Sequence, residues 1–253
     1  MAGVMLCEPT ELYNILNQHR RFPRLSEPNY LILLDARTLR EYNESHIITA
    51  REYLVPDSEE LACVRYCVVY DSMTIEVNRT AAQHARSLQQ FTRHPVLVLR
   101  GGYKRFSACY HFLRTQKILW MPQELDNFQP YPVEILSGKL YMGNFKQACN
   151  QQIQKDLKIK AQVSISEQPA TLLAEEGKYL HISVPDSPEA DLFSSFSTIS
   201  LSHSRILKWS DSWDYVLKCK TNVRPHRGFV KQLSDWEAQI YGTTITDVSE
   251  PNY

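Results

Sequence analysis

The first 120 residues alternate short apolar runs with stretches in which apolar side chains recur at helical spacing. The apolar runs lie at residues 30–35, 66–70 and 95–99. Runs of this length without polar alternation are typical of strands that are buried on both faces of a sheet. Residues 80–93, between the last two runs, carry apolar side chains at helical spacing. This strand–helix–strand order predicts an α/β fold, a parallel sheet with helices on both faces. Further helices are predicted to begin at Pro9 and to span residues 106–113, after Gly101 and Gly102.

Residues 133–253 begin a second series of elements. Strands are predicted at residues 133–136, 140–142, 160–165 and 179–184. A helix is expected over 144–157, and after Pro188 the pattern indicates helices alone, around Trp209 and Trp213 and from Phe229 to Ile240. The preceding segment, 121–132, contains three prolines and is predicted to be an extended linker. The predicted organisation is therefore a first domain at 1–120, this linker, a second domain at 133–243 and a flexible tail at 244–253.

Composition excludes several classes of protein. The chain has 253 residues, with 28 Lys+Arg and 28 Asp+Glu, so it lacks the basic excess of a nucleic-acid-binding protein. It has no apolar run long enough to span a membrane and no signal-peptide core, so we expect a cytoplasmic protein. The basic cluster formed by Arg20, Arg21 and Arg24 leaves a mitochondrial location as the alternative.

The six cysteines are scattered along the chain and are expected to be reduced thiols. Cys63 and Cys67 have C-x3-C spacing, but no second cysteine pair or nearby histidine completes a zinc site. We therefore predict neither a metal nor a cofactor.

Several motifs in the first half resemble those of the rhodanese family. Asp35 and Arg37 end an apolar run, the pair His46-Ile47 follows a helical stretch, and Gly101-Gly102 comes after a later strand. In this order and spacing the motifs resemble a rhodanese over about residues 8–120. The resemblance implies a parallel sheet whose central strand, 66–70, leads directly into the catalytic loop.

A working rhodanese has a cysteine directly after that central strand, at the head of a loop that surrounds a persulfide. In this chain the resemblance places Asp71 at the nucleophile position. A carboxylate cannot carry the transferred sulfur, and its charge repels anionic sulfur donors. Cys63 and Cys67 are both expected to fill core space. The first domain is therefore predicted to be an inactive rhodanese-like domain.

Inactive rhodanese-like modules precede the catalytic domain in mitogen-activated protein kinase phosphatases, where a basic cluster after the histidine–isoleucine turn docks the kinase. The matching segment here, 51–60, is acidic except for Arg51 at its start. This difference counts against kinase docking at that segment. Lys104 and Arg105 are the candidate binding residues that could replace it, with an ordinary solvated turn as the alternative.

The second half resembles a dual-specificity phosphatase domain over roughly residues 132–200 and 210–241. The resemblance places Asp186 at the position of the general acid, which protonates the leaving oxygen while a thiolate attacks phosphorus. Such an enzyme also needs a Cys-x5-Arg loop with glycines that let the backbone approach the phosphate. Cys109 and Cys219 each have an arginine five positions later instead of six. No glycine lies between Asp186 and Gly228, so the phosphate loop is predicted to be missing.

The serine-rich segment 197–205, which ends at Arg205, is either a remnant of that loop or the end of an amphipathic helix. The second domain is thus predicted to be an incomplete, inactive dual-specificity-phosphatase-like α/β domain. The two domains together resemble the pseudophosphatases of the serine/threonine/tyrosine-interacting kind. This implies a catalytically inactive regulatory protein that binds other proteins, namely phosphatases, kinases or their substrates. The alternatives are a residual phosphatase that uses Asp186 and Arg205, and a sulfurtransferase with an unconventional cysteine.

Overall fold

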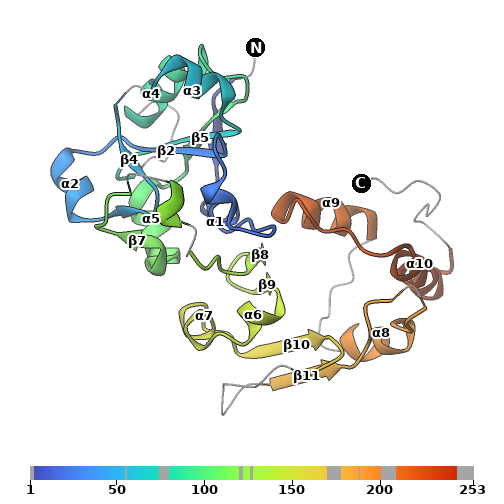
Figure 1. Cartoon of the computed structure of the whole chain (residues 1–253). Coiled ribbons are helices and arrows are strands. Elements are labelled where there is room, and N and C mark those ends of the chain that lie inside the picture. Colours follow the sequence, from blue (N-terminus) through green and yellow to red (C-terminus); the bar gives the residue numbers. More distant parts are fainter. Residues whose placement is uncertain are drawn as a thin grey trace. The chain divides into compact units, whose positions relative to one another are not determined.

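The computed structural model describes residues 3–54, 56–73, 80–119, 122–125, 128–169, 178–187, 189–200 and 209–243. The chain divides into two compact units, Met1–Glu134 and Ile135–Tyr253, whose elements are labelled in Figure 1. The first unit is built on a five-stranded sheet in which all neighbours are parallel, in the order β1-β6-β5-β2-β4. Its strands are β1 (Met5–Cys7), β2 (Leu31–Asp35), β4 (Arg51–Glu52), β5 (Tyr66–Tyr70) and β6 (Val96–Leu99). The predicted parallel sheet is confirmed, and β2 and β5 are buried along almost their whole length, as their uninterrupted apolar runs indicate.

Helices cover both faces of this sheet (Figure 1). One face is covered by α3 (Ser58–Cys63) and α4 (Thr80–Gln89), and the other by α1 (Pro9–Leu16), α2 (Leu39–Glu44) and α5 (Gly102–Cys109). Under α3 and α4, apolar side chains of β2, β5 and β6 form a continuous core with the helices. The remaining elements are the short antiparallel pair β3 (His46–Ile47) and β7 (Arg114–Thr115), and the 3-10 turns η1 (Arg24–Ser26), η2 (His111–Leu113) and η3 (Pro122–Leu125).

The helix predicted over residues 106–113 begins earlier than expected. The structure starts α5 at Gly102 and ends it at Cys109, and residues 111–113 form the separate turn η2. Gly101 and Gly102 have φ angles of +78° and +56°, a region that glycine enters readily. The two glycines therefore turn the chain directly from β6 into the helix instead of separating two elements.

The boundary between the units differs from the predicted one. The described residues of 128–134, which overlap the predicted linker at 121–132, belong to the first unit. The Asn14 side chain donates to the carbonyl of Glu134 at 2.8 Å and accepts from its N–H at 2.7 Å. Because both groups are buried, these bonds fix the segment against α1. The first unit thus extends fourteen residues beyond the predicted limit of residue 120.

Two separate pairs of strands follow, the first of which begins at the boundary between the units, since β8 (Val133–Leu136) starts in the last two residues of the first unit. β8 pairs with β9 (Leu140–Met142), and β10 (Ala161–Ile165) pairs in parallel with β11 (Lys178–Ile182). The helices are α6 (Phe145–Ala148), α7 (Gln151–Asp156), α8 (Phe193–Ser200), α9 (Trp209–Cys219) and α10 (Arg227–Tyr241). The single helix expected over 144–157 is divided, because the Asn150 side chain caps a new helix at Gln151.

Helices alone follow Pro188 in the part of the chain that the structure describes, as the sequence predicts. The predicted tail, 244–253, lies outside the described residues. A small core joins Ile182, Val184 and Ala190, with Phe229 of α10 packed against it. Among the helices that are described, none is long and apolar enough to cross a membrane.

Candidate functional site at the carboxyl ends of the parallel strands

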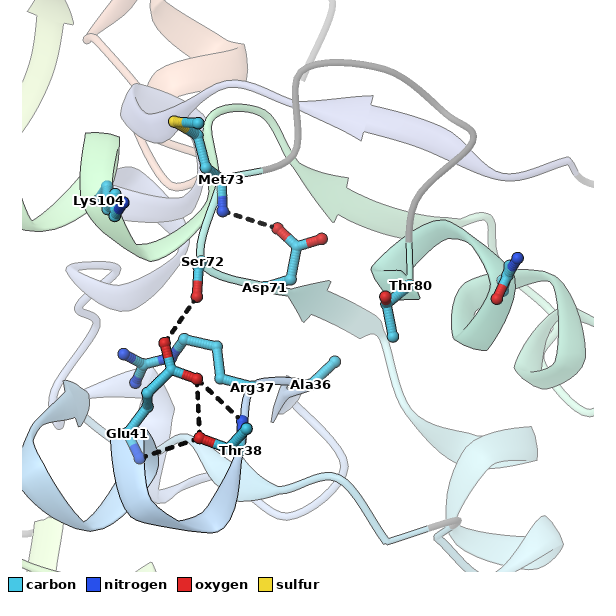
Figure 2. Close-up of a pocket in the computed structure, with 10 residues that line it drawn as sticks. Ala36, Arg37, Thr38, Glu41, Asp71, Ser72, Met73, Thr80 and Lys104 are labelled. Carbon is cyan, nitrogen blue, oxygen red and sulfur yellow. Dashed lines mark hydrogen bonds between the residues drawn. The ribbon is translucent and has the colours of Figure 1, made fainter.

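The loops after β2, β5 and β6 meet at the carboxyl-terminal edge of the sheet in the first unit. There they surround a hollow of about 560 Å³ (Figure 2). The residues that line it are Ala36, Arg37, Thr38, Glu41, Asp71, Ser72, Met73, Thr80, Gln83 and Lys104. Crevices at this edge of a parallel sheet are the usual ligand sites of open α/β folds. The hollow is therefore the candidate functional site.

A buried ion pair forms the base of this site. Asp35, the last residue of β2, is fully buried, and its carboxylate accepts two hydrogen bonds from Arg37 Nε, at 2.9 and 3.1 Å, and one from Nη2 at 2.6 Å. The hydroxyl of Tyr70, at the end of β5, donates to the same carboxylate at 2.8 Å. A buried carboxylate needs such partners, because an unpaired charge in the interior is costly. The network ties the ends of β2 and β5 together under the hollow.

The same arginine connects the sheet to α5. The Arg37 guanidinium lies 3.8 Å from the centre of the Tyr103 ring, and its Nη2 also donates to the carbonyl of Ser45 at 2.7 Å. The Tyr103 hydroxyl donates to the Ser45 hydroxyl at 2.8 Å. Arg37 therefore serves as a structural element of the site, with its charge already matched by Asp35.

Gly102 lets the segment after β5 lie directly against the start of α5. A Cβ atom at this position would come within 2.3 Å of the Asp71 carbonyl oxygen and 2.8 Å of the Met73 nitrogen. The close approach allows Tyr103 N–H to donate to Asp71 O at 2.7 Å. The N–H of Lys104 donates to Ser72 O at 3.1 Å in the same way. The first free N–H groups of α5 are therefore used to hold the loop and are not directed at a ligand.

Asp71 directly follows β5 and lines the hollow, as Figure 2 shows. Its carboxylate accepts from the N–H of Met73 at 3.0 Å. Beside it, Glu41 accepts from the hydroxyls of Thr38 at 2.8 Å and Ser72 at 2.9 Å, and these bonds lower the pKa of Glu41 below its ordinary value. Two carboxylates thus occupy the site, and the Met73 N–H of the loop after β5 is bonded to one of them.

The cysteines of the first unit lie away from the position after β5. The sequence has no cysteine between Cys67 and Cys109. Cys67 lies inside β5 and is buried, as predicted. The prediction for Cys63 is wrong: it is exposed at the end of α3, because the buried face of this short helix is formed by Leu61. Among the described residues that line the hollow, the groups offered to a ligand include the carboxylates of Glu41 and Asp71, the hydroxyls of Thr38, Ser72 and Thr80, and the Lys104 ammonium.

Thiol alkylation is expected to separate the cysteines by burial. Burial raises the pKa of Cys67 to about 12, so this thiol is almost wholly protonated at pH 8. A short iodoacetamide pulse at pH 8, read by peptide mass spectrometry, should modify the exposed Cys63 and Cys109 and leave Cys67 unmodified. Unfolding in urea should make all three react alike. Modification of Cys67 in the folded chain at the rate of Cys63 would contradict the structure.

The two predicted binding residues lie next to this site, on the first turn of α5. Lys104 lines both the hollow described above and an adjoining one of about 510 Å³, which Met73, Arg100, Gly101 and Arg105 complete. Arg105 is exposed and pairs with Glu8 at 3.3 Å. In the segment that resembles a kinase-docking region, Arg51 pairs with Glu60 at 2.9 Å, which offsets its charge. Among the described residues, α5 therefore supplies two basic groups near the site, those of Lys104 and Arg105.

The second unit does not show its predicted catalytic residues together. Asp186 is exposed in the segment after β11. Cys219 is the last residue of α9 and is buried, so it does not head a loop. Arg205 lies outside the described residues. Between the β8–β9 pair and the β10–β11 pair, no strand of the described chain joins the two sheets.

Sequence comparison finds similarity to one protein family and to two known phosphatases. The Rhodanese-like domain family matches residues 21–109. A probable rhodanese domain-containing dual specificity protein phosphatase of Dictyostelium discoideum is 23% identical over 178 residues, 57% of this chain and 37% of that protein. The dual specificity protein phosphatase Mpk3 of Drosophila melanogaster is 26% identical over 147 residues, 45% of this chain and 36% of that protein. Residues 21–109 are thus similar to rhodanese-like domains, the chain is similar to these two dual-specificity phosphatases, and it spans little more than a third of their length.

A solved structure of the human tyrosine phosphatase-like serine/threonine/tyrosine-interacting protein also matches. It is 20% identical, with 44% of this chain and 97% of that chain covered and a TM-score of 0.36. A score this low does not define a shared fold.

Several residues of the site were not predicted from the sequence. Arg37 was recognised only as part of a motif, and its ion pair with Asp35 depends on the turn after β2. Glu41 and Ser72 are 31 positions apart, and no sequence signal joins them. The spacing Asp35-Ala-Arg37, a charged pair directly after a buried strand, is the one signal that could have indicated the buried network.

Proposed function

We propose that this chain is a catalytically inactive, phosphatase-like binding protein that regulates phosphorylation signalling by occupying protein partners. The observation that carries the proposal is Asp71. It stands directly after the central strand β5, where the resemblance to rhodaneses requires a nucleophilic cysteine. A carboxylate there cannot form a persulfide, because the reaction needs a thiolate.

The second unit supports the same proposal. The sequence between Asp186 and Gly228 contains neither a Cys-x5-Arg motif nor a glycine that could shape a phosphate cradle. We infer that the chain belongs with the pseudophosphatases of the serine/threonine/tyrosine-interacting-like kind and lacks the segment that carries the phosphate loop. Its partners are then other proteins, namely phosphatases, kinases or their substrates, met in the cytoplasm.

Two enzymatic alternatives remain distinguishable from this proposal. A residual phosphatase would have to bring Asp186 and Arg205 together. A sulfurtransferase would have to use a cysteine elsewhere in the chain, because the nucleophile position is occupied by Asp71. Exposed Cys63 and Cys109 are the candidates for such an unconventional thiol.

The binding role is tested by capture experiments with the full-length chain. Lys104 and Arg105 provide the basic, exposed rim of the site, so Lys104→Glu with Arg105→Glu should reduce capture of phosphatases and kinases, identified by mass spectrometry, at least fivefold. The matched control is Arg40→Glu, because Arg40 is 87% exposed and lies on α2, outside the residues that line the hollows. Equal capture by wild type, the double variant and the control would remove these two residues from the proposal.

A further inference from the structure

β10 is an edge strand with one side open in the described part of the chain. It pairs with β11 alone among the described strands, in parallel, with Val163 beside Leu180. In a strand, the N–H and C=O groups of alternate residues point to opposite edges. Lys160 O and Ser166 N bond to β11, at 3.1 and 3.2 Å, so even-numbered residues face β11. The backbone groups of Ala161, Val163 and Ile165 consequently face the open edge.

The side chains of the same residues form an apolar row. Val163 is 42% exposed and Ile165 is 51% exposed. Their register with β11 places them on the same face of the sheet as Leu180 and Ile182, which pack in the core of the second unit. The apolar face of this sheet is therefore covered at Leu180 and Ile182 on β11. It is exposed at Val163 and Ile165 on β10, beside the open edge.

This edge lacks the features that normally prevent strand pairing. Protected edges carry charges, prolines or bulges, whereas residues 161–165 contain no charged residue and no proline. Charges flank the strand and have opposite signs at its two ends, with Lys158 and Lys160 before it and Glu167 after it. The outer edge of β11 offers no such row, because Tyr179, Leu180 and His181 are half-buried there.

We propose that β10 pairs antiparallel with β10 of a second copy of this chain, with Val163 opposite its counterpart. This arrangement places Ala161 opposite Ile165 and joins the two apolar rows on one face. It also brings the basic end of each strand to the acidic end of the other. The charge pattern fits a second copy, because antiparallel pairing of two identical strands brings unlike charges together at both ends at once. The interface goes beyond the proposed function, which does not require a dimer.

Cross-linking of the full-length chain tests this geometry directly. Lys160 and Glu167 are about 23 Å apart if the chain between them is extended, too far for a zero-length carbodiimide link within a chain. In an equal mixture of ¹⁴N- and ¹⁵N-labelled chains, the Lys160–Glu167 peptide pair should therefore appear with mixed isotopes. Failure to find this pair, or a dimer that is linked through other segments alone, would overturn the proposal.

Sedimentation measurements on variants provide an independent test. Ile165→Lys should weaken dimerisation at least tenfold, whereas Leu54→Lys, at a 72% exposed site in the first unit, should leave it unchanged. Glu167→Lys should weaken it about threefold or more, and adding Lys160→Glu should restore it. Circular dichroism confirms that each variant is folded. A wild-type chain that stays monomeric at 100 μM, or a charge exchange that fails to restore the dimer, contradicts the interface. Lys104→Glu with Arg105→Glu should not affect the dimer, so the two proposals can fail separately.

Discussion

Replacing Asp35 with alanine is expected to lower the free energy of unfolding of the first unit by about 3–5 kcal/mol. The Arg37 side chain is only 5% exposed, so the substitution leaves its charge buried without a counter-charge. It also removes the acceptor of the Tyr70 hydroxyl. Most of the loss comes from the arginine that remains, since a buried charge without its partner is costly.

The control for this prediction is Arg40→Ala. Arg40 and Glu44 form an ion pair whose side chains are 87% and 63% exposed, and breaking it should cost less than about 1 kcal/mol. Urea-dependent hydrogen exchange of the β2 and β5 peptides reports the stability of this unit separately from the second. Similar losses for Asp35→Ala and Arg40→Ala would show that the buried network does not hold the site together.

Gly102→Ala is expected to destabilise the first unit by about 3 kcal/mol or more. Alanine at a φ of +56° costs about 1–2 kcal/mol by itself. Its Cβ would also lie 2.3 Å from Asp71 O and 2.9 Å from Ser72 C, which are backbone atoms that cannot rotate away. The loop after β5 would have to leave α5, and its hydrogen bonds with Tyr103 and Lys104 would be lost.

Gly101→Ala is the matched control, one residue away in the same turn. Its φ of +78° is also unfavourable, and the new Cβ would lie 2.5 Å from Cδ and 2.6 Å from Cβ of Arg105, so α5 would have to adjust at its first turn. The three atoms nearest to the new Cβ all belong to Arg105 and none to the loop after β5, so the loss should be smaller than for Gly102→Ala. The same hydrogen-exchange measurement compares the two variants. Equal destabilisation would mean that the contact between Gly102 and the segment 71–73 does not determine the position of the loop.

The sequence predicts the first unit well because its strands are long enough to be recognised. β5 coincides with the predicted run 66–70, and β2 and β6 each begin one residue later than predicted. The short strands β1 and β4 were not predicted, because strands of three and two residues are too short to show a hydrophobic periodicity. Gly101 and Gly102 were interpreted as a break, whereas their positive φ angles start a helix.

The candidate site was predicted in part. Asp71 and Lys104 were identified from their neighbours in the sequence, and both line the same hollow. Pairings between distant segments were not predicted, such as Glu41 with Ser72. They depend on how the loops converge, which no local pattern specifies. For the same reason the bonds of Asn14 with Glu134, which extend the first unit, were missed.

The most direct test of the account is a turnover assay on the full-length protein with an aryl phosphate and with thiosulfate as substrates. Three proteins are compared: wild type, Asp186→Ala, and a variant in which all six cysteines are changed to serine. We predict no turnover of either substrate by wild type above the rate of these variants. A wild-type rate that is lost in Asp186→Ala or in the variant without cysteines would contradict the proposal that this chain binds without catalysing.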